Sequence, residues 1–485
     1  MDRSTAVLIV FFACGAALLA IAVWAARRTH NANDFFLTNR RLGVWFVALS
    51  HTANASPVWL LLAVSAAAFT WGYSALWIWL SVLGGYLLNW FYVAPRLRAL
   101  AAGQGSLTVV QVLSAEAGER LQPLIVRSAA LILSIVLLLE IGAVLNTAGS
   151  VVASGFGLDT TTTLISSVVL VVIVTLVGGY WAVAAGDILQ IVVMLLVGLL
   201  LPLSAIISAG GIEQLRIGFA ALGPAVNDLL GGRAGVVAIA FVVGVSGFGF
   251  ALPGQPHAIN RFMAARDDST LRSARWLSLA CIAVLLGAMI VCGWCARVLY
   301  AGMAANPDRA LFVIADRALP PWLAVIVGAL ILCALLANIG SRLLVIAASL
   351  SADTKRATSP LSYAWARVVL VLFTIVVLCF ALYAHGSILE QAMFAFSVMG
   401  SAFGPLLLVR LAGKRVRPGS TLGAMWTGFI LTWLFHVLPD SPGDFLERVF
   451  PFVAALGIAL SGGERRRNPD RADRSQQTVH DRVPI

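Results

Sequence analysis

The chain has 485 residues, of which 60% are hydrophobic and only 11% are charged, and its mean hydropathy is +0.93. Soluble domains contain about 25% charged residues, so this composition excludes a soluble enzyme and indicates a protein that crosses a membrane several times. The net charge of +11 falls in short segments between apolar runs. It therefore reports membrane topology rather than nucleic-acid binding.

We predict thirteen membrane-spanning helices, because an α-helix needs about 20 apolar residues to cross the roughly 30 Å of hydrocarbon in a bilayer. The first run is too long for a signal-peptide core and is followed by Arg27 and Arg28, so it should remain as a helix. The predicted spans cover residues 4–26, 44–69, 73–95, 122–152, 161–181, 187–209, 235–256, 276–301, 322–350, 363–384, 388–410, 420–438 and 446–461.

The placement of basic residues predicts how the chain lies in the membrane. Most of the 33 lysines and arginines fall in alternate loops and in the tail, which the positive-inside rule assigns to the cytoplasm. An odd number of spans then puts the N-terminus in the periplasm and the C-terminus in the cytoplasm. We expect residues 1–461 to form a single transmembrane domain and residues 462–485 a disordered cytoplasmic tail.

The second predicted span carries its own break at Ala53–Pro57. Pro57 has no N–H, so the carbonyl of Ala53 loses its helical partner deep in the membrane. Two interpretations remain open: a proline kink that neighbouring helices satisfy, or a cavity in which the carbonyl binds a cation or a polar ligand. The polar side chains around the break are His51, Thr52, Asn54 and Ser56.

A second break lies at Gly247–Pro256, in the seventh predicted span. Pro253 and Pro256 free the carbonyls of Gly249 and Leu252, and nearby glycines weaken the helix further. This break lies five spans after the first one. Paired breaks at matching positions indicate inverted repeats with a binding site between them, so spans 2–6 and 7–11 should form two five-helix repeats.

Four segments resemble the sodium/solute symporter family, most closely its sodium/proline symporters. They read FFLTNRRLGVWFVALS, LNWFYVAPRLR, GGYWAVAAGDILQ and GQPHAINRFMA, and the similarity runs from about residue 35 to residue 350. The resemblance implies an all-α, LeuT-like membrane protein with a core at 44–410 and peripheral helices at 4–26 and 420–461. It also implies a secondary transporter of a small polar solute, such as a proline-like amino acid, that works by alternating access in a bacterial-type inner membrane.

The sodium site implied by the resemblance is degraded in this chain. Where the family has two hydroxyls, the sequence offers Ala337 and Asn338, and Ala55 replaces a carboxylate. Sodium needs several hard oxygen ligands, so we predict that sodium coupling is weak and that a proton is the alternative coupling ion. No other cofactor is expected. By residue-to-residue transfer, the site would comprise Ala53, Ser56, Ala334, Ala337 and Asn338.

The substrate cavity implied by the resemblance lies around the two breaks. Two aromatic positions of the family correspond to Phe248 and Leu252, and a third corresponds to Glu140. Only one aromatic residue therefore remains at these three positions. The residues expected to line the cavity are His51, Asn54, Trp59, Glu140, Phe248, Leu252 and Pro256. His257 is expected to shape the second break rather than to bind substrate.

Glu140 is a carboxylate near the middle of the membrane, about 20 Å of helix from Arg127 at the inner rim. An ionisable group at this depth is a functional candidate, although it can also make a structural hydrogen bond to a neighbouring helix. His51 is a candidate partner in a proton relay, or a structural histidine.

Arg342 lies one turn beyond Asn338. It is either a snorkelling arginine near the inner interface or a fixed cation near the lost sodium, with Asp187 as its counter-charge. Glu140, Asp187 and Arg342 are thus the coupling candidates.

A rival function is a membrane sensor or scaffold that keeps the symporter fold without transport. The degraded sodium site favours this alternative. The sequence contains no paired catalytic carboxylates, nucleophile elbow, P-loop or metal cluster, so no enzymatic activity is expected. The expected partners are a small-molecule solute and membrane lipid, without nucleic acid, and the sequence does not predict the oligomeric state. The six cysteines are interpreted as small apolar residues.

Overall fold

Helices account for most of the residues that the computed structural model describes, which are 3–56, 58–156, 159–300, 310–352, 360–383, 388–439 and 441–465. The first elements are α1 (Arg3–Ala26), α2 (Ala32–Leu37), η1 (Thr38–Arg40), α3 (Val44–Ala55), α4 (Val58–Trp71), η2 (Gly72–Ala75), α5 (Leu76–Leu87), η3 (Leu88–Val93), α6 (Ala94–Gln104), α7 (Val109–Ser114), α8 (Gly118–Phe156), α9 (Thr160–Ser208) and α10 (Ile212–Ala220).

The later elements complete the bundle. They are α11 (Gly235–Ala251), η4 (Leu252–Gly254), α12 (Pro256–Ala264), α13 (Asp268–Leu299), α14 (Ala310–Ala318), α15 (Pro321–Ala337), α16 (Ile339–Ala347), η7 (Ala348–Ala352), α17 (Pro360–Tyr383), α18 (Ile388–Leu411), β1 (Lys414–Val416), α19 (Pro418–His436), η8 (Pro442–Asp444), α20 (Phe445–Arg448), α21 (Phe450–Ser461) and β2 (Gly463–Arg465).

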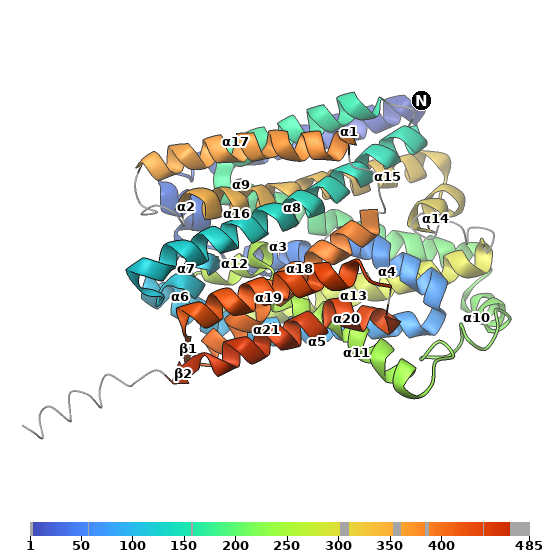
Figure 1. Ribbon diagram of the computed structural model, residues 1–485. Coiled ribbons are helices and arrows are strands. Elements are labelled where there is room, and N and C mark those ends of the chain that lie inside the picture. Colours follow the sequence, from blue (N-terminus) through green and yellow to red (C-terminus); the bar gives the residue numbers. More distant parts are fainter. Residues whose placement is uncertain are drawn as a thin grey trace, which may run out of the picture.

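The long helices run side by side along one axis, which lies across the page in Figure 1. The short elements α2, α6 and α7 and the strands β1 and β2 gather at one end of the bundle, and α10 and α14 lie at the other end. Helix α1 packs on α9 and α15, and α18 packs on α8 and α19. The polar connections therefore collect at the two ends of an apolar bundle, as in a protein that spans a bilayer.

Eight stretches of the described residues are long and apolar enough to cross a membrane. Two of them, Leu60–Gln104 and Leu164–Ser208, are 45 residues long, and each is interrupted by a glycine with positive φ, Gly72 at 63° and Gly179 at 55°. The count of thirteen spans and the two inverted repeats therefore stay predictions. The eight stretches are Leu60–Gln104, Gly118–Asn146, Leu164–Ser208, Gly235–Gly254, Asp268–Leu299, Pro321–Ser351, Ala364–Tyr383 and Glu390–Leu411.

Helix α9 contains the predicted spans 161–181 and 187–209 and bends at Gly179. The bend places Gly179 at φ 55° and ψ −143°, a conformation that only glycine adopts easily. A side chain here would also collide with α2, because a Cβ on Gly179 would lie 2.6 Å from Cδ2 of Phe35. The sequence predicted the connection between the two spans at residues 182–186, just after this kink.

Small residues allow other helices to pack closely against the two broken helices. A Cβ on Gly85 in α5 would lie 2.5 Å from the carbonyl oxygen of Gly249 in α11. On the other side of the bundle, a Cβ on Gly293 in α13 would lie 2.3 Å from the carbonyl oxygen of Ser65 in α4. Such close backbone contacts are the usual way in which helices associate inside a membrane, where burial of apolar surface adds little.

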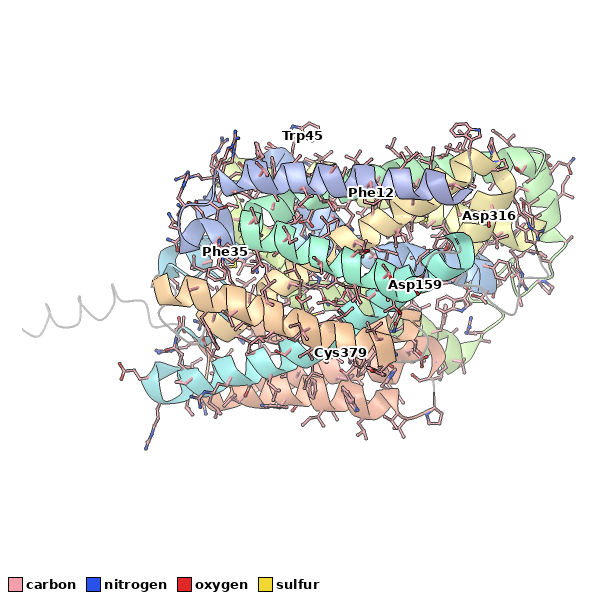
Figure 2. The ribbon with its side chains drawn as sticks, turned by 90° about the horizontal axis from the view of Figure 1, so that it is seen from above. Phe12, Phe35, Trp45, Asp159, Asp316 and Cys379 are labelled. Carbon is pink, nitrogen blue, oxygen red and sulfur yellow. The ribbon has the colours of Figure 1, made fainter. Side chains whose placement is uncertain are left out.

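Large apolar side chains cover the outside of the bundle. Phe12 and Trp45 are 69% and 66% exposed, and Figure 2 shows Trp45 at the outer edge of the bundle and Phe12 on α1. An apolar exterior of this kind suits contact with lipid rather than with water.

The antiparallel strands β1 and β2 join the ends of α18 and α21, with Arg415 opposite Glu464. Residues Gly463–Arg465 were predicted to belong to a disordered tail, and the structure corrects this boundary. The strands are too short to leave an alternating pattern in the sequence. The remainder of the predicted tail, residues 466–485, lies outside the described residues.

Candidate functional site

The first break exposes a backbone carbonyl, as the sequence predicts. Helix α3 ends at Ala55, and Ser56 leaves the helical conformation at φ −137° and ψ 72°. The carbonyl oxygen of Ala53 accepts hydrogen bonds from Nδ2 of Asn338 at 3.2 Å and from Nε2 of Gln190 at 3.3 Å. Neighbouring helices thus satisfy the carbonyl with two amide donors. This arrangement is the one expected for a proline kink that neighbouring helices satisfy, rather than for a carbonyl that binds a cation or a polar ligand.

Glu140 and Arg342 form an ion pair inside the bundle. Oε1 of Glu140 lies 2.5 Å from Nη2 of Arg342, and the two side chains are 0% and 1% exposed. Nη1 of Arg342 donates to the carbonyl oxygen of Asn338 at 3.0 Å and also to its side-chain Oδ1. Arg342 is therefore buried beside Asn338 rather than extended toward the inner interface.

The hydrogen-bond chemistry fixes how Asn338 is oriented. A guanidinium can only donate, so the amide oxygen of Asn338 faces Arg342 and the amide nitrogen faces Ala53. The same nitrogen also lies 3.3 Å from Oε1 of Gln190. Asn338 therefore links the ion pair to the broken helix.

These contacts do not fit a sodium ion at the position implied by the sequence. The oxygens of Ala53 and Asn338 already accept hydrogen bonds from Gln190 and Arg342, and Ala337 has no side-chain oxygen. A cation would also lie close to the guanidinium of Arg342. Only the carbonyls of Ser56 and Ala334 remain from the predicted set, whereas hard cations require about six oxygen ligands.

A second ion pair joins Asp187 on α9 to Arg261 on α12. Oδ2 of Asp187 lies 2.6 Å from Nη2 of Arg261, and both side chains are buried. Oγ of Ser50 on α3 donates to the same carboxylate oxygen at 2.5 Å and accepts from Nε of Arg261 at 2.8 Å. Arg261 also donates to the carbonyl of His257, and its guanidinium lies 5.0 Å from the ring centre of Tyr180.

The pairing differs from the predicted one. Arg342 was expected to take Asp187 as its counter-charge, but it pairs with Glu140, and Asp187 pairs with Arg261. Arg261 lies between the predicted spans 235–256 and 276–301, yet its side chain is 1% exposed. The sequence could not show that α12 carries this arginine back into the bundle.

Asn54 connects α3 to the same network. Its Nδ2 donates to the carbonyl of Ser50 at 2.9 Å, and its Oδ1 accepts from Oγ of Ser341 on α16. Two other residues of α3 contact the ion pairs. Ser50 is hydrogen-bonded to Asp187 and Arg261, and the Ala53 carbonyl is hydrogen-bonded to Asn338, which contacts Arg342. The broken helix is therefore the element that the two buried pairs share.

His51 lies in an aromatic environment rather than beside Glu140. Its ring stacks on Phe262 at 4.6 Å and meets the rings of Tyr86 and Trp90 at 5.2 and 5.1 Å. Its Nδ1 lies 3.4 Å from Oγ of Ser278. These contacts favour the structural interpretation of His51 and do not support a proton relay to Glu140.

The remaining cavity candidates gather around the second break. Phe248 lies under the guanidinium of Arg448, 4.4 Å from its ring centre, and Leu252 packs on Gly85 of α5. Pro256 begins α12, and Gln255 before it donates to the carbonyls of Ala251 and Phe396 at 3.1 and 2.9 Å. Pro57 and the side chain of Trp59 lie outside the described residues.

Gln190 and Arg261 belong to this network although neither was among the predicted site residues. Both stand within the quoted segments, Gln190 at the end of GGYWAVAAGDILQ and Arg261 within GQPHAINRFMA. A polar amide one turn from Asp187, in an otherwise apolar run, was the available signal. Among the described residues, no group of three or more His, Cys, Asp or Glu side chains could hold a metal ion.

Comparison with known proteins agrees with the resemblance. The sodium:solute symporter family matches residues 35–430. The osmoregulated proline transporter OpuE of Bacillus subtilis is 28% identical over 459 residues, which cover 92% of each chain. The sodium/proline symporter of Escherichia coli is 26% identical over 464 residues, covering 90% of this chain and 91% of that one.

Solved structures share the fold. A Na+-coupled sialic acid symporter in a substrate-bound outward-open state matches with a TM-score of 0.77 at 18% identity, covering 96% of this chain and all of that one. Mhp1, a nucleobase-cation-symport-1 family transporter, matches with a TM-score of 0.53 at 14% identity and covers 88% and 93% of the two chains.

The neighbours are helical transporters of the LeuT-like class, and the family consists of transporters rather than enzymes. Its name indicates Na+ as the coupling ion, which contrasts with the ligand set found here. The match covers well over half of the chain, so the protein is a multi-pass membrane protein that belongs to the sodium:solute symporter family.

Proposed function

We propose that the protein is a secondary transporter that moves a small polar solute, an amino acid such as proline, across the inner membrane. The substrate class is supported by the names of OpuE and of the sodium/proline symporter, which resemble this chain over about nine tenths of its length. The N-terminus would face the periplasm and the C-terminus the cytoplasm, as the basic residues predict.

The transport cycle would use the two broken helices as its moving parts. Breaks of this kind let each half-helix tilt separately while the outer bundle keeps its packing. The Asp187–Arg261 pair and Ser50 join the inner halves of both broken helices, α3 and α12, to α9. We assign this cluster the role of an inner gate that opens when solute leaves toward the cytoplasm.

The proposed coupling does not depend on sodium, and one observation carries this part of the proposal. Two amide groups and a guanidinium occupy the oxygens around Ala53 and Asn338 that a sodium ion would need. Arg342 supplies a fixed positive charge in place of a mobile one. A proton is the alternative coupling ion, and Glu140 can take part only in a state in which its pair with Arg342 opens.

Uptake of labelled proline into proteoliposomes tests this function. We expect uptake to continue in potassium buffer, with less than about a twofold gain from an inward sodium gradient, because a site lacking most of its hard ligands binds the ion weakly. An inward proton gradient is imposed in a parallel arm and identifies proton coupling. A steep sodium requirement that Asn338→Ala abolishes would overturn the proposal.

A sensor or scaffold is the second candidate, and the fixed ion pair at the ion site favours it. A transporter must exchange two states, whereas Glu140 and Arg342 hold α8 against α16 without a mobile ion. The same proteoliposomes separate the candidates. A folded protein that binds proline, shown by a saturable rise in its unfolding temperature, but does not move it under any gradient would support the sensor.

A further inference from the structure

A cavity of about 240 Å³ lies between the η1 segment and the connection from α6 to α7. These elements sit at the end of the bundle that also carries α2, β1 and β2 (Figure 1). Arg40, Asn33 and Asn39 give the cavity polar walls, and Leu37 and Leu107 give it apolar ones. A single water needs only about 10–15 Å³ of such space, so the cavity has room for a polyatomic ligand.

Arg40 is a cation without an anionic partner among the described residues. Its Nη2 donates to the carbonyls of Ala101 and Ser106 at 3.0 and 2.9 Å, and its buried Nη1 has no hydrogen-bond partner in the part of the chain that the structure describes. Burial first, and then the positive charge of Arg98, lower the pKa of the Arg40 guanidinium. An anion in the cavity would stabilise the charged guanidinium and so offset both the burial of Arg40 and its repulsion by Arg98.

The backbone at Arg40 is held in an unusual conformation. Thr38, Asn39 and Arg40 have φ values of 51°, 51° and 56°, and left-handed residues other than glycine cost about 1–2 kcal/mol each. The next residues bridge to the end of α12, because Leu42 donates to the carbonyl of Ala264 and accepts from the N–H of Arg266. A ligand bound to Arg40 would thus contact the segment that leads into the broken helix α3.

We propose that this cavity binds the phosphate of an anionic lipid headgroup, with Arg40 as the main cationic contact and Asn33 and Asn39 as additional hydrogen-bond donors. The site requires a phosphate-bearing anion, and two features favour lipid as its source. Leu107 offers an apolar contact to the glycerol end of the headgroup, and anionic lipids gather near basic segments at a membrane surface.

Thermal unfolding of the purified full-length protein in detergent tests the site. Phosphatidylglycerol is titrated against the wild type, and phosphatidylcholine serves as the zwitterionic control. Arg40→Gln is compared with Arg41→Gln, which removes the same charge from an exposed neighbouring side chain. We expect phosphatidylglycerol to stabilise the wild type and Arg41→Gln, and its apparent affinity to fall about tenfold or more in Arg40→Gln, since charge-assisted hydrogen bonds are lost.

Leu107→Trp provides a second variant that keeps Arg40 but fills the cavity, in case Arg40→Gln does not fold. It should weaken the response to phosphatidylglycerol as well. Equal responses of the wild type, Arg40→Gln and Leu107→Trp, or equal effects of the two lipids, would overturn the site.

Inorganic phosphate is titrated in a separate arm. Stabilisation by inorganic phosphate that Arg40→Gln abolishes, without any response to phosphatidylglycerol, would support the anion site and overturn lipid as its source.

Discussion

The two buried ion pairs resemble each other in geometry but differ in what they join. Glu140–Arg342 connects α8 to α16, and it reaches the broken helix α3 only through Asn338. Asp187–Arg261 connects α9 to α12, which is the second half of a broken helix, and Ser50 adds the first half of the other. We therefore call Glu140–Arg342 the scaffold pair, because it joins parts of the bundle that stay packed together. We call Asp187–Arg261 the gate pair, because the proposed movement separates its partners.

This difference has an energetic consequence. A buried pair gains Coulomb energy but loses the hydration of both ions, so its net contribution to stability is small while removal of one partner is costly. If the gate pair opens, water can return to both charges. The scaffold pair has no such relief, because Asn338 and the packed helices hold Arg342 in place.

The largest expected effect is at the scaffold pair. Arg342→Gln leaves the Glu140 carboxylate buried without its cation and should lower the free energy of unfolding by about 3–5 kcal/mol. The double variant Glu140→Gln with Arg342→Gln should lose much less, since no charge remains buried. Thermal and denaturant unfolding of the single and double variants measures the difference. Strictly additive losses would mean that the pair is not coupled.

A smaller loss of stability is expected at the gate pair, together with a specific change in dynamics. Asp187→Asn should cost about 1–3 kcal/mol, because Arg261 can regain water by opening. Backbone amides of α12 should exchange hydrogen faster, and those of α16 should not.

Asp268→Asn is the matched control for the gate variant. It removes an ion pair with Arg98 at the same end of the bundle, but the Asp268 side chain is 61% exposed, so it should change stability by less than about 1 kcal/mol. If hydrogen exchange in the Asp187→Asn variant became faster to the same extent in α12 and α16, the result would contradict the proposed gating role of the Asp187–Arg261 pair.

The next largest loss of unfolding free energy is expected when an amide donor to the Ala53 carbonyl is removed. Gln190→Leu removes one of the two donors to that carbonyl and should cost about 1 kcal/mol of unfolding free energy. It should not create a sodium requirement, because Arg342 and Asn338 still occupy the site. Unfolding and uptake measured in sodium and potassium buffers check both parts, and sodium-dependent uptake by this variant would show that Gln190 alone excludes the ion.

The smallest effect is expected at Ser341→Ala. The hydroxyl donates to Asn54, so its loss removes one hydrogen bond between α16 and the broken helix α3. The loss should be about 0.5 kcal/mol, the low end of what a single neutral hydrogen bond contributes. Unfolding should register this change while proline uptake stays close to that of the wild type. Complete loss of uptake would place Ser341 in the transport machinery instead.

The sequence predicted both breaks because proline and glycine act locally. Missing N–H groups at Pro57 and Pro253 break helical hydrogen bonds whatever the surrounding fold. The sequence also identified Glu140, Asp187 and Arg342, since an ionisable residue within an apolar run is conspicuous. Each of these conclusions needs only the identity of a residue and its close neighbours in the chain.

The partners of these residues could not be predicted in the same way. Arg342 and Glu140 are 202 residues apart, and Asp187 and Arg261 are 74 apart, so their pairing depends on how the helices pack. Apolar residues cover most faces of the spans, and helical periodicity therefore says little about rotation. That is why Asp187 was assigned to the wrong cation and the two interpretations of His51 stayed open.

Direct binding of sodium to the purified protein is the sharpest test of the central claim that protein groups occupy the sodium site. The unfolding temperature is measured while NaCl replaces KCl at constant ionic strength, with and without proline. We predict no saturable, sodium-specific rise in the unfolding temperature, because the Ala53 carbonyl already accepts hydrogen bonds from Asn338 and Gln190. A saturable rise with sodium that Asn338→Ala removes would contradict the account.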